Sequence, residues 1–245
     1  MTALKDGLVT AASGGIGDAM VRTMLSDPIL ERVFAVSSVK EAPEDLRNNG
    51  KLNWIRCDYS SVDIAKTANR LLSMNCNLVL GAICNGILHD NGIKPEKRMD
   101  DIQEETLNRV FTANAIVPIL WVKELAKVFS KSDMCSIAIL SARVGSISDN
   151  RLGGWYSYRA SKSALNMLLK TSAIELNRKH KNVKLISFHP GTTDTKLSRP
   201  FQSSVSRDKL FTPDFVATKL MDLMRKTDVD GELSFLDWAG VPIDW

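Results

Sequence analysis

The feature that most restricts the fold is a short strand-prone segment that turns through small residues into an amphipathic helix. Residues 5–10 are strand-prone, residues 11–17 contain three glycines, and the helical pattern continues to about residue 26. Small residues at such a turn let backbone N–H groups and the positive end of the helix reach a pyrophosphate. The same glycines also serve simply to pack a helix tightly onto a strand. The pattern therefore predicts an α/β protein and makes a phosphate site one of two interpretations.

Composition agrees with one domain over residues 1–245 and argues against several classes of protein. The chain is 44% hydrophobic and 24% charged, which suits a single globular core. Its net charge of +4 is small and dispersed, so we expect no nucleic-acid partner. No secretion signal and no apolar run near 18 residues is present, so we expect no membrane insertion. The four cysteines lack CxxC spacing, which favours reduced thiols in a cytoplasmic protein and no metal site.

Further strand and helix patterns alternate along the chain. Strands are expected over residues 32–37, 52–57, 77–84, 134–140, 183–188 and 231–236, and helices from about residue 62, over about 102–130, over about 157–180 and over 213–226. Residues 41–50 are too few for a full crossover helix, so we expect a single turn there. The order predicts a Rossmann-like, doubly wound parallel sheet of about seven strands in one α/β domain.

Tyr158 and Lys162 stand four residues apart near the start of the segment 157–180. On a helix this spacing places both side chains on one face. An ammonium beside a phenol favours the phenolate, so we expect the pKa of Tyr158 to fall from about 10 toward neutrality. Such a phenol can exchange a proton with a carbonyl or alcohol oxygen. A surface tyrosine beside a solvated lysine is the alternative interpretation.

Two motifs resemble those of the short-chain dehydrogenase/reductase family. The sequence TAASGGIG over residues 10–17 is similar to the family's TGxxxGIG loop, and Tyr158-x-x-x-Lys162 is similar to its YxxxK centre. The resemblance covers essentially the whole chain, and segments 141–147 and 153–162 resemble the C-factor-like subgroup. One departure is Ala11, which replaces the first glycine of the loop. If that position needs a positive φ, the strain is about 1–2 kcal/mol.

The resemblance implies a nicotinamide dinucleotide and assigns residues to it. The implied cofactor-binding set contains Thr10, Ala11, Ser13, Gly14, Gly15, Ile16, Gly17, Ser37, Ser38, Asp58, Tyr59, Asn85, Gly86, Tyr158, Lys162, Pro190, Gly191, Thr193 and Thr195. The second strand leads into Ser37, Ser38 and Lys40 rather than into a carboxylate. Hydroxyls and an ammonium suit a 2′-phosphate, so NADP(H) is favoured over NAD(H). The same residues are also ordinary for a surface loop.

Two of these assignments have open alternatives. Asp58 resembles the family's acid at the adenine amino group, but it also stands where a cap for the next helix is expected, with Ser60 and Ser61 competing. In the segment from Asn85, only Gly86 keeps the family's usual register, so only its close backbone approach to the adenosine carries over.

The resemblance also implies a catalytic set of Asn114, Ser141, Tyr158 and Lys162. Asn114 matches the asparagine that kinks a helix and holds a water linking the active-site lysine to solvent; a solvent-facing amide is the alternative. The substrate-orienting serine is less clear, because counting back from Gly145 places Ala142 at its usual position. Ser141 is our prediction for this role, with Ser146 in reserve. Residues 196–212, rich in Ser and Arg, are expected to form a substrate lid.

The sequence therefore predicts an NADP(H)-dependent oxidoreductase that interconverts a small-molecule carbonyl and alcohol, with Tyr158 as general acid and base. The alternative is a nucleotide-binding signalling or scaffold protein with little or no catalysis. Since the family often pairs its two longest helices, we expect a homodimer or homotetramer through segments 102–130 and 157–180.

Overall fold

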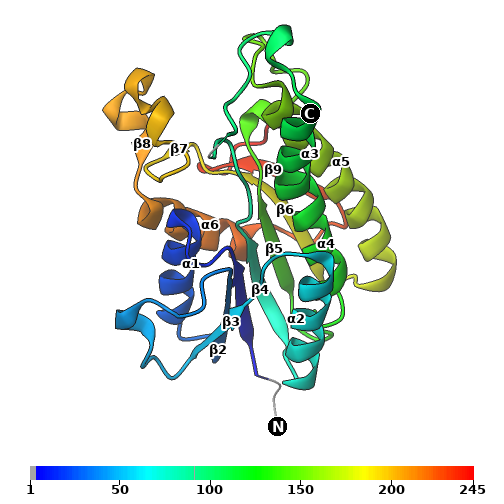
Figure 1. The fold of residues 1–245 in the computed structure, drawn as a ribbon. Coiled ribbons are helices and arrows are strands. Elements are labelled where there is room, and N and C mark those ends of the chain that lie inside the picture. The colour runs from blue at the N-terminus through cyan, green and yellow to red at the C-terminus, as the bar shows by residue number, and fades with distance from the viewer. Residues whose placement is uncertain (1–3, 91) are drawn as a thin grey trace.

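A computed structural model describes residues 4–90 and 92–245 and has a parallel sheet at its centre (Figure 1). The sheet has seven strands in the order β3-β2-β1-β4-β5-β6-β9, all parallel, as the sequence predicts. Its strands are β1 (Asp6–Thr10), β2 (Arg32–Ser37), β3 (Leu52–Arg56), β4 (Leu78–Ile83), β5 (Cys135–Leu140), β6 (Val183–His189) and β9 (Leu233–Asp237). A separate pair is formed by β7 (Thr192–Thr193) and β8 (Leu210–Phe211).

Helices cover both faces of the sheet. They are α1 (Gly15–Leu25), α2 (Ser61–Ser73), α3 (Glu104–Phe111), α4 (Val117–Leu125), α5 (Tyr156–Lys179) and α6 (Pro213–Lys226). Figure 1 shows α1 and α6 together on one face and α2, α4 and α5 on the other. Each face has its own apolar core, one around Trp121 and Leu165 and the other around Met20 and Phe188. The two cores fix the sheet between its helix layers.

The order of the strands places a crevice at the carboxyl end of the sheet. From β1 the chain moves outward to β2 and β3, and then returns to β4 on the other side of β1. Such a reversal opens a crevice beyond the carboxyl ends of the adjacent strands. The glycine turn follows β1 and Asn85 follows β4, so both segments border this crevice.

The helix expected over residues 102–130 is interrupted, and its prediction as one element is wrong. A π-helical turn, Thr112–Ile116, separates α3 from α4. Asn114 is buried in that turn, where its amide accepts from Ile87 N at 2.7 Å and donates to Ile87 O at 2.9 Å. These bonds hold the widened turn against the segment after β4. Past Leu125 the backbone leaves the helix, because Val128 and Ser130 hydrogen-bond with Leu78 of β4.

Two connecting segments were predicted with different success. The segment 41–50 contains only a 3₁₀ turn, Glu44–Leu46, which confirms the expected single turn. Residues 196–212 have more structure than their sequence indicates, with 3₁₀ turns at Arg199–Ser204 and Arg207–Lys209 followed by β8. Since β8 pairs with β7, both ends of this segment are fixed beside the crevice.

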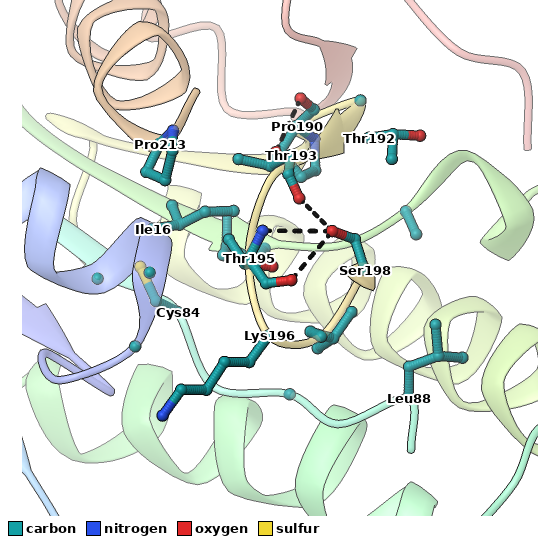
Figure 2. Close-up of a pocket in the computed structure, with 18 of the residues that line it drawn as sticks. Ile16, Cys84, Leu88, Pro190, Thr192, Thr193, Thr195, Lys196, Ser198 and Pro213 are labelled. Atoms are coloured by element: carbon teal, nitrogen blue, oxygen red, sulfur yellow. Dashed lines mark hydrogen bonds between the residues drawn. The ribbon is translucent and has the colours of Figure 1, made fainter. Parts of the chain in front are cut away.

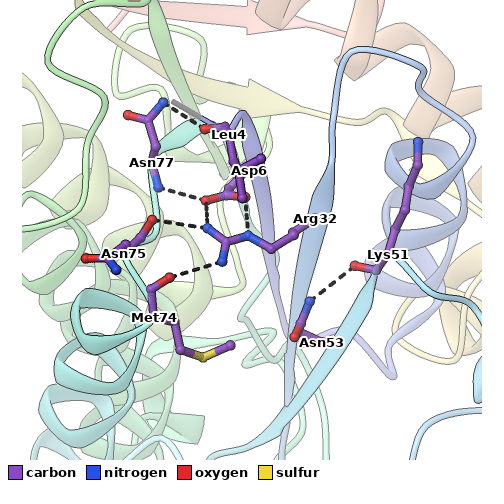
Figure 3. Close-up of polar contacts among 8 residues, drawn as sticks. All are labelled: Leu4, Asp6, Arg32, Lys51, Asn53, Met74, Asn75 and Asn77. Atoms are coloured by element: carbon purple, nitrogen blue, oxygen red, sulfur yellow. Dashed lines mark hydrogen bonds and ion pairs between the residues drawn. The ribbon is translucent and has the colours of Figure 1, made fainter. Parts of the chain in front are cut away.

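The amino end of the sheet is held by an ion pair between a half-buried arginine and a buried aspartate (Figure 3). Arg32 of β2 donates to both carboxylate oxygens of the fully buried Asp6 of β1, at 2.8 and 2.7 Å. The same guanidinium donates to the carbonyls of Met74 and Asn75, while Asn77 N donates to Asp6 Oδ2. The network therefore ties β1 and β2 to the segment between α2 and β4.

The four cysteines are unpaired, as the lack of CxxC spacing predicts. Cys57, Cys76 and Cys135 are buried and Cys84 is half-buried, and all four are free thiols. Within residues 4–90 and 92–245, none of the helices combines the length and apolar character that a bilayer span requires.

Candidate active site

A cavity of about 1160 Å³ occupies the carboxyl end of the sheet (Figure 2). Its wall includes most of the predicted site: Ala11, Ser13, Gly14, Gly15, Ile16, Gly17, Asn85, Gly86, Ser141, Tyr158, Lys162, Pro190, Gly191, Thr193 and Thr195. These residues follow β1, β4, β5 and β6 or lie on α1 and α5. Thr10, Ser37, Ser38, Asp58, Tyr59 and Asn114 lie outside the wall. The sheet thus brings together segments that are up to about 180 residues apart in sequence.

The glycine turn brings exposed backbone to the start of α1. Gly14 and Gly15 are exposed, and a Cβ added at Gly17 would lie 2.2 Å from Ala11 O. Ala11 itself has φ 50°, so the strain expected for this departure is present. Tyr59 holds the turn, because its hydroxyl accepts from Ala11 N at 3.1 Å and donates to Val36 O at 3.3 Å. Bare N–H groups at a helix N-terminus fit a pyrophosphate.

The segment after β6 closes over this turn. A Cβ added at Gly15 would lie 2.6 Å from Cγ2 of Thr195, so glycine is needed there for the two segments to meet. Ser198 organises the segment: its hydroxyl accepts from Thr195 N at 3.3 Å and bonds the carbonyl of Thr193 (Figure 2). Gln202 also donates to this hydroxyl, at 2.8 Å. The start of the predicted lid is therefore fixed onto the glycine turn.

The end of β2 carries polar and basic groups. Ser37 is fully buried and donates to Ser13 Oγ at 2.8 Å, so its hydroxyl supports the glycine turn rather than facing solvent. Ser38 and Lys40 are exposed. Glu41, the nearest following carboxylate, pairs with Arg47 at 2.8 Å. Ser38 and Lys40 thus present a hydroxyl and an ammonium at this end of β2.

Asp58 lies in the turn before α2. Its carboxylate accepts from Ser60 N at 2.8 Å, and hydrogen bonding from the hydroxyl and then the backbone N–H of Ser60 lowers the pKa of Asp58. Ser60 is the N-cap of α2, since its hydroxyl accepts from Asp63 N at 3.2 Å. The helix cap is therefore Ser60, and Asp58 shapes the turn ahead of it.

Polar side chains hold the segment after β4. Thr10 Oγ1 donates to Asn85 Oδ1 at 2.6 Å and accepts from Cys84 N at 3.2 Å, which ties the ends of β1 and β4 together. A Cβ added at Gly86 would lie 3.2 Å from Asn114 Oδ1 and 3.4 Å from Lys162 Nζ. Gly86 therefore lets the backbone pass between an amide and an ammonium. Asn114 also donates to Ser161 Oγ at 3.1 Å, which joins it to α5.

Tyr158 and Lys162 share one face of α5 and both line the cavity, as their spacing predicts. Nζ of Lys162 lies 5.9 Å from the centroid of the Tyr158 ring and donates to Leu140 O at 2.8 Å. Burial lowers the pKa of Lys162 to about 7 and raises the pKa of Tyr158 to about 12. The pKa of the phenol is thus higher than expected from the sequence, because loss of solvent outweighs the effect of the amine in the protein alone.

The candidate serines differ in their surroundings. Ser141 lines the cavity, but its hydroxyl donates to Asn166 Oδ1 at 2.8 Å. Ala142, which also lines the cavity, has no hydroxyl to offer. Ser146 is buried outside the cavity wall, where it accepts from Asp149 N at 3.1 Å. Of the two serines considered, only Ser141 borders the space beside Tyr158.

Several residues of the wall were missed by sequence reasoning. Trp155 and Phe201 contact each other, with ring centroids 5.1 Å apart, and His189 lies at the end of β6. Leu88 and Val144 add apolar surface. His189 could have been found, because residues at the carboxyl ends of parallel strands border the crevice. The aromatic residues carried no sequence signal, since their contact depends on how two loops fold over the cavity.

The ring of His89, in the loop after β4, joins two loops. Its Nε2 lies 3.1 Å from both Lys196 O and Leu197 O, and the ring meets Phe201 edge-on at 5.7 Å. The loop after β4 and the predicted lid are therefore in direct contact.

Comparison with known proteins places this geometry in a family. The model for short chain dehydrogenases matches residues 5–205. A benzil reductase ((S)-benzoin forming) of Bacillus subtilis is 24% identical over 244 residues, covering 92% of this chain and 96% of its own. The C-signal protein of Myxococcus xanthus is 26% identical over 147 residues, covering 60% of this chain and 83% of its own.

Solved structures agree with the sheet order and the helix layers. The NADPH-bound carbonyl reductase from chicken fatty liver superposes with a TM-score of 0.84 at 23% identity, with 100% of both chains covered. At this identity the likeness shows the fold, and the family follows from the match over residues 5–205. This chain belongs to the short chain dehydrogenase family, and it is an oxidoreductase of that type.

Proposed function

We propose that the chain is an NADP(H)-dependent oxidoreductase that interconverts a carbonyl and an alcohol. The observation that carries the proposal is the single cavity, in which the phosphate-binding turn, Tyr158 and Lys162 all face one space. The pyrophosphate of a dinucleotide would fit the glycine turn, because the exposed Gly14 and Gly15 bring bare backbone to the cavity at the N-terminus of α1. The bound nicotinamide would supply or accept the hydride.

In the reduction direction Tyr158 gives its phenolic proton to the oxygen that gains charge as the carbonyl is reduced. Its raised pKa keeps this proton in place at neutral pH, so the donor is loaded before reaction. In the oxidation direction the phenolate must form, and the Lys162 ammonium favours it. Because an anionic dinucleotide in the cavity would raise the pKa of Lys162 above about 7, binding would strengthen this effect.

We assign Lys162 also to the nicotinamide ribose and Asn114 to the support of Lys162. The buried amide of Asn114 and the ammonium approach the same point beside Gly86. This arrangement supports a path for protons past Lys162 toward solvent, as the family resemblance implies. Asn85 and Gly86 would then border the adenosine half, with Asp58 and Tyr59 farther along.

Ser141 is proposed to orient the substrate oxygen with the help of Asn166. Asn166 Oδ1 accepts from Ser141 at 2.8 Å and from Ser187 at 2.6 Å, while its buried Nδ2 has no partner among the described residues. Rotation of the amide by half a turn would direct Nδ2 at both serine oxygens. The hydroxyl proton of Ser141 would then be free to bond a carbonyl oxygen in the cavity.

The preference for NADP(H) over NAD(H) rests on the end of β2. Ser38 and Lys40 are exposed there, and Glu41 is engaged with Arg47. A 2′-phosphate would meet a cation and would not meet a free carboxylate. The NADPH in the chicken carbonyl reductase is consistent with this choice.

The test is Tyr158→Phe, with Tyr156→Phe as its matched control two residues away outside the cavity wall. Reduction of aldehydes, ketones and diketones is followed by oxidation of NADPH. We expect Tyr158→Phe to lower kcat by about 10²–10⁴-fold, the range for general acid–base catalysis, with NADPH affinity within about twofold of the parent. The control should keep parental kcat. A Tyr158→Phe enzyme that works at the parental rate would refute the role.

A second candidate is a C-factor-like signalling or scaffold protein that binds the nucleotide with little or no catalysis. Ala142 favours it, because the position usual for the substrate-orienting serine has no hydroxyl. The match to the C-signal protein supports the same subgroup. NADPH binding without oxidation of NADPH across a broad carbonyl panel would support this candidate over the enzyme.

We infer a cytoplasmic homodimer or homotetramer with a small-molecule substrate. The free thiols suit a reducing compartment. Exposed apolar side chains gather on the π-helical turn and on α5, where Ile116 is 47%, Met167 67% and Ile174 44% exposed. A second copy packed on these helices would cover them, and light scattering tests this directly.

A further inference from the structure

Glu96 is a buried carboxylate in the loop between β4 and α3, outside the cavity wall. It is 2% exposed, although glutamate is among the residues least often buried. Its Oε2 accepts from Ser157 N at 3.2 Å, and its backbone carbonyl accepts from Trp155 N at 2.5 Å. Glu96 thus contacts the chain on both sides of the point where α5 begins.

The start of α5 lacks a cap of its own. Its N-cap residue is Trp155, whose side chain makes no capping bond. An uncapped helix leaves its first N–H groups without partners, and an anion placed there is favoured by the helix dipole. Glu96 supplies that group from a segment about 60 residues earlier in the sequence.

The backbone ahead of α5 is also strained. Gly153, Gly154 and Trp155 have φ values of 64°, 65° and 52° in succession. A positive φ costs glycine little, but it strains a residue with a bulky side chain such as tryptophan. A strained residue persists only where its surroundings hold it, and the hydrogen bond from Trp155 N to Glu96 supplies part of that restraint.

The strained residue borders the reacting group. The Trp155 ring meets the Tyr158 ring edge-on, with centroids 6.1 Å apart, and contacts Phe201 of the predicted lid. Tyr158 is the third residue of α5, so the position of its phenol depends on where the first turn begins. A shift of the first turn by a fraction of an ångström would move the hydroxyl relative to a bound carbonyl.

We propose that Glu96 is a positioning residue for Tyr158, acting through the first turn of α5 and the Trp155 ring. The proposal rests on the proposed function, since it concerns the same general acid. A purely structural cap would stabilise the fold without changing the chemistry of correctly folded molecules. The two roles differ in kcat, which a positioning role changes even when the protein is fully folded.

The experiment compares three variants with the parent. Glu96→Ala removes the acceptor, and Glu96→Gln keeps an oxygen acceptor without the charge. Ser60→Ala removes the cap of α2, a helix that contributes nothing to the cavity wall, and so measures the effect of a lost cap alone. Each variant is assayed well below its melting temperature for kcat, for the KM of the carbonyl, for NADPH affinity and for amide hydrogen exchange at residues 155–160.

We expect Glu96→Ala to lower kcat at least tenfold, with NADPH affinity within twofold, and to speed exchange at residues 155–160. Because Glu96→Gln keeps the oxygen acceptor, its kcat should lie within about threefold of the parental value. Ser60→Ala should lower the melting temperature and leave kcat unchanged. If Glu96→Ala keeps parental kcat, or loses kcat only as far as Ser60→Ala does, the positioning role is overturned.

Turnover and hydrogen exchange distinguish failure of the proposed function from failure of the role of Glu96. If the parent shows no turnover with any carbonyl, the oxidoreductase proposal fails, while hydrogen exchange still reports whether Glu96 holds the start of α5. Unchanged exchange at residues 155–160 in Glu96→Ala would then overturn the contact itself. If Glu96→Ala does not fold, Glu96→Gln decides. Parental exchange rates and a parental kcat in that variant support the role of Glu96 as a hydrogen-bond acceptor. Faster exchange together with a lower kcat contradicts that role.

Discussion

Ala11 occupies a backbone conformation that a side chain disfavours. Its φ of 50° lies in the left-handed region, where alanine is strained by about 1–2 kcal/mol. Replacement by glycine removes this strain but adds about 0.4–1 kcal/mol of freedom to the unfolded chain. We expect Ala11→Gly to raise the free energy of unfolding by about 0.5–1 kcal/mol, measured by urea denaturation.

Ala12 provides the matched control for that prediction. It is fully buried and is not among the residues with positive φ. Ala12→Gly should therefore lower the free energy of unfolding. The glycine adds conformational freedom to the unfolded chain, relieves no strain in the folded chain and removes a buried methyl group. An Ala11→Gly protein less stable than the parent would contradict the argument.

His189 links pH to stability at the residue scale. Burial lowers its pKa from 6.5 to about 4, with Arg143 adding to the shift and Asp237 opposing it. Between these values the unfolded chain binds more protons than the folded protein, so stability is lost as pH falls from about 6.5 through about 4. The loss is on the order of 2–3 kcal/mol.

The measurement is urea denaturation at several pH values between 7 and 4 for the parent and for His189→Gln. Glutamine does not titrate, so the variant should lose less stability than the parent over this range. The difference between the two curves isolates His189 from the carboxylates that titrate in the same window. Parallel curves would show that His189 is not responsible.

At the scale of elements, the local patterns predicted the framework and failed where distant contacts decide. Every strand of the main sheet was located to within about two residues of its end, because apolar runs and turn residues mark them. The π-helical turn was not predicted as such, since it depends on the bonds of Asn114 to Ile87 from another segment. The short turns within residues 196–212 likewise depend on Ser198 and on pairing with β7.

The residues of the candidate site could likewise be predicted only in part. The glycine turn and the pair Tyr158 and Lys162 could be predicted, because chain order and spacing fix them. The inward direction of Ser37 and the bond from Ser141 to Asn166 could not, since both depend on packing between elements. Glu96 escaped detection for the same reason.

Ser198 fixes the start of residues 196–212. Its hydroxyl bonds the backbone of Thr193 and Thr195 and the side chain of Gln202. Each lost hydrogen bond costs about 1 kcal/mol, or about fivefold in an opening equilibrium. We expect Ser198→Ala to speed tryptic cleavage within residues 196–212 by about fivefold or more, followed by mass spectrometry.

The control for that experiment is Ser172→Ala on α5. Ser172 is half-buried, and its hydroxyl donates within its own helix, to Leu168 O at 2.9 Å. Its removal should leave cleavage within residues 196–212 unchanged. Equal cleavage rates in the parent and in Ser198→Ala would show that Ser198 does not stabilise residues 196–212.

At the scale of the whole molecule, stability and chemistry are separated at opposite ends of the sheet. The Asp6–Arg32 network lies at the amino end and the cavity at the carboxyl end. Removing one partner of a buried ion pair leaves a buried charge uncompensated, at about 3–5 kcal/mol. We expect Arg32→Leu to lower the free energy of unfolding by about 3 kcal/mol and to leave kcat per folded molecule unchanged.

A double variant sharpens that test. Asp6→Leu combined with Arg32→Leu removes both charges, so it should recover part of the stability lost by Arg32→Leu alone. Calorimetry gives the stabilities and active-site titration gives the folded fraction. A drop in kcat per folded molecule would show that the two ends of the sheet are coupled.

The Tyr59 hydroxyl has a consequence for how a nucleotide would arrive. It sits between Ala11 N and Val36 O and so joins the ends of three neighbouring strands before any ligand is bound. The conformational entropy of the glycine turn is therefore lost when the chain folds, rather than when the nucleotide associates. A nucleotide that bound there would therefore meet a turn already held in place, and its phosphates would not have to order that turn.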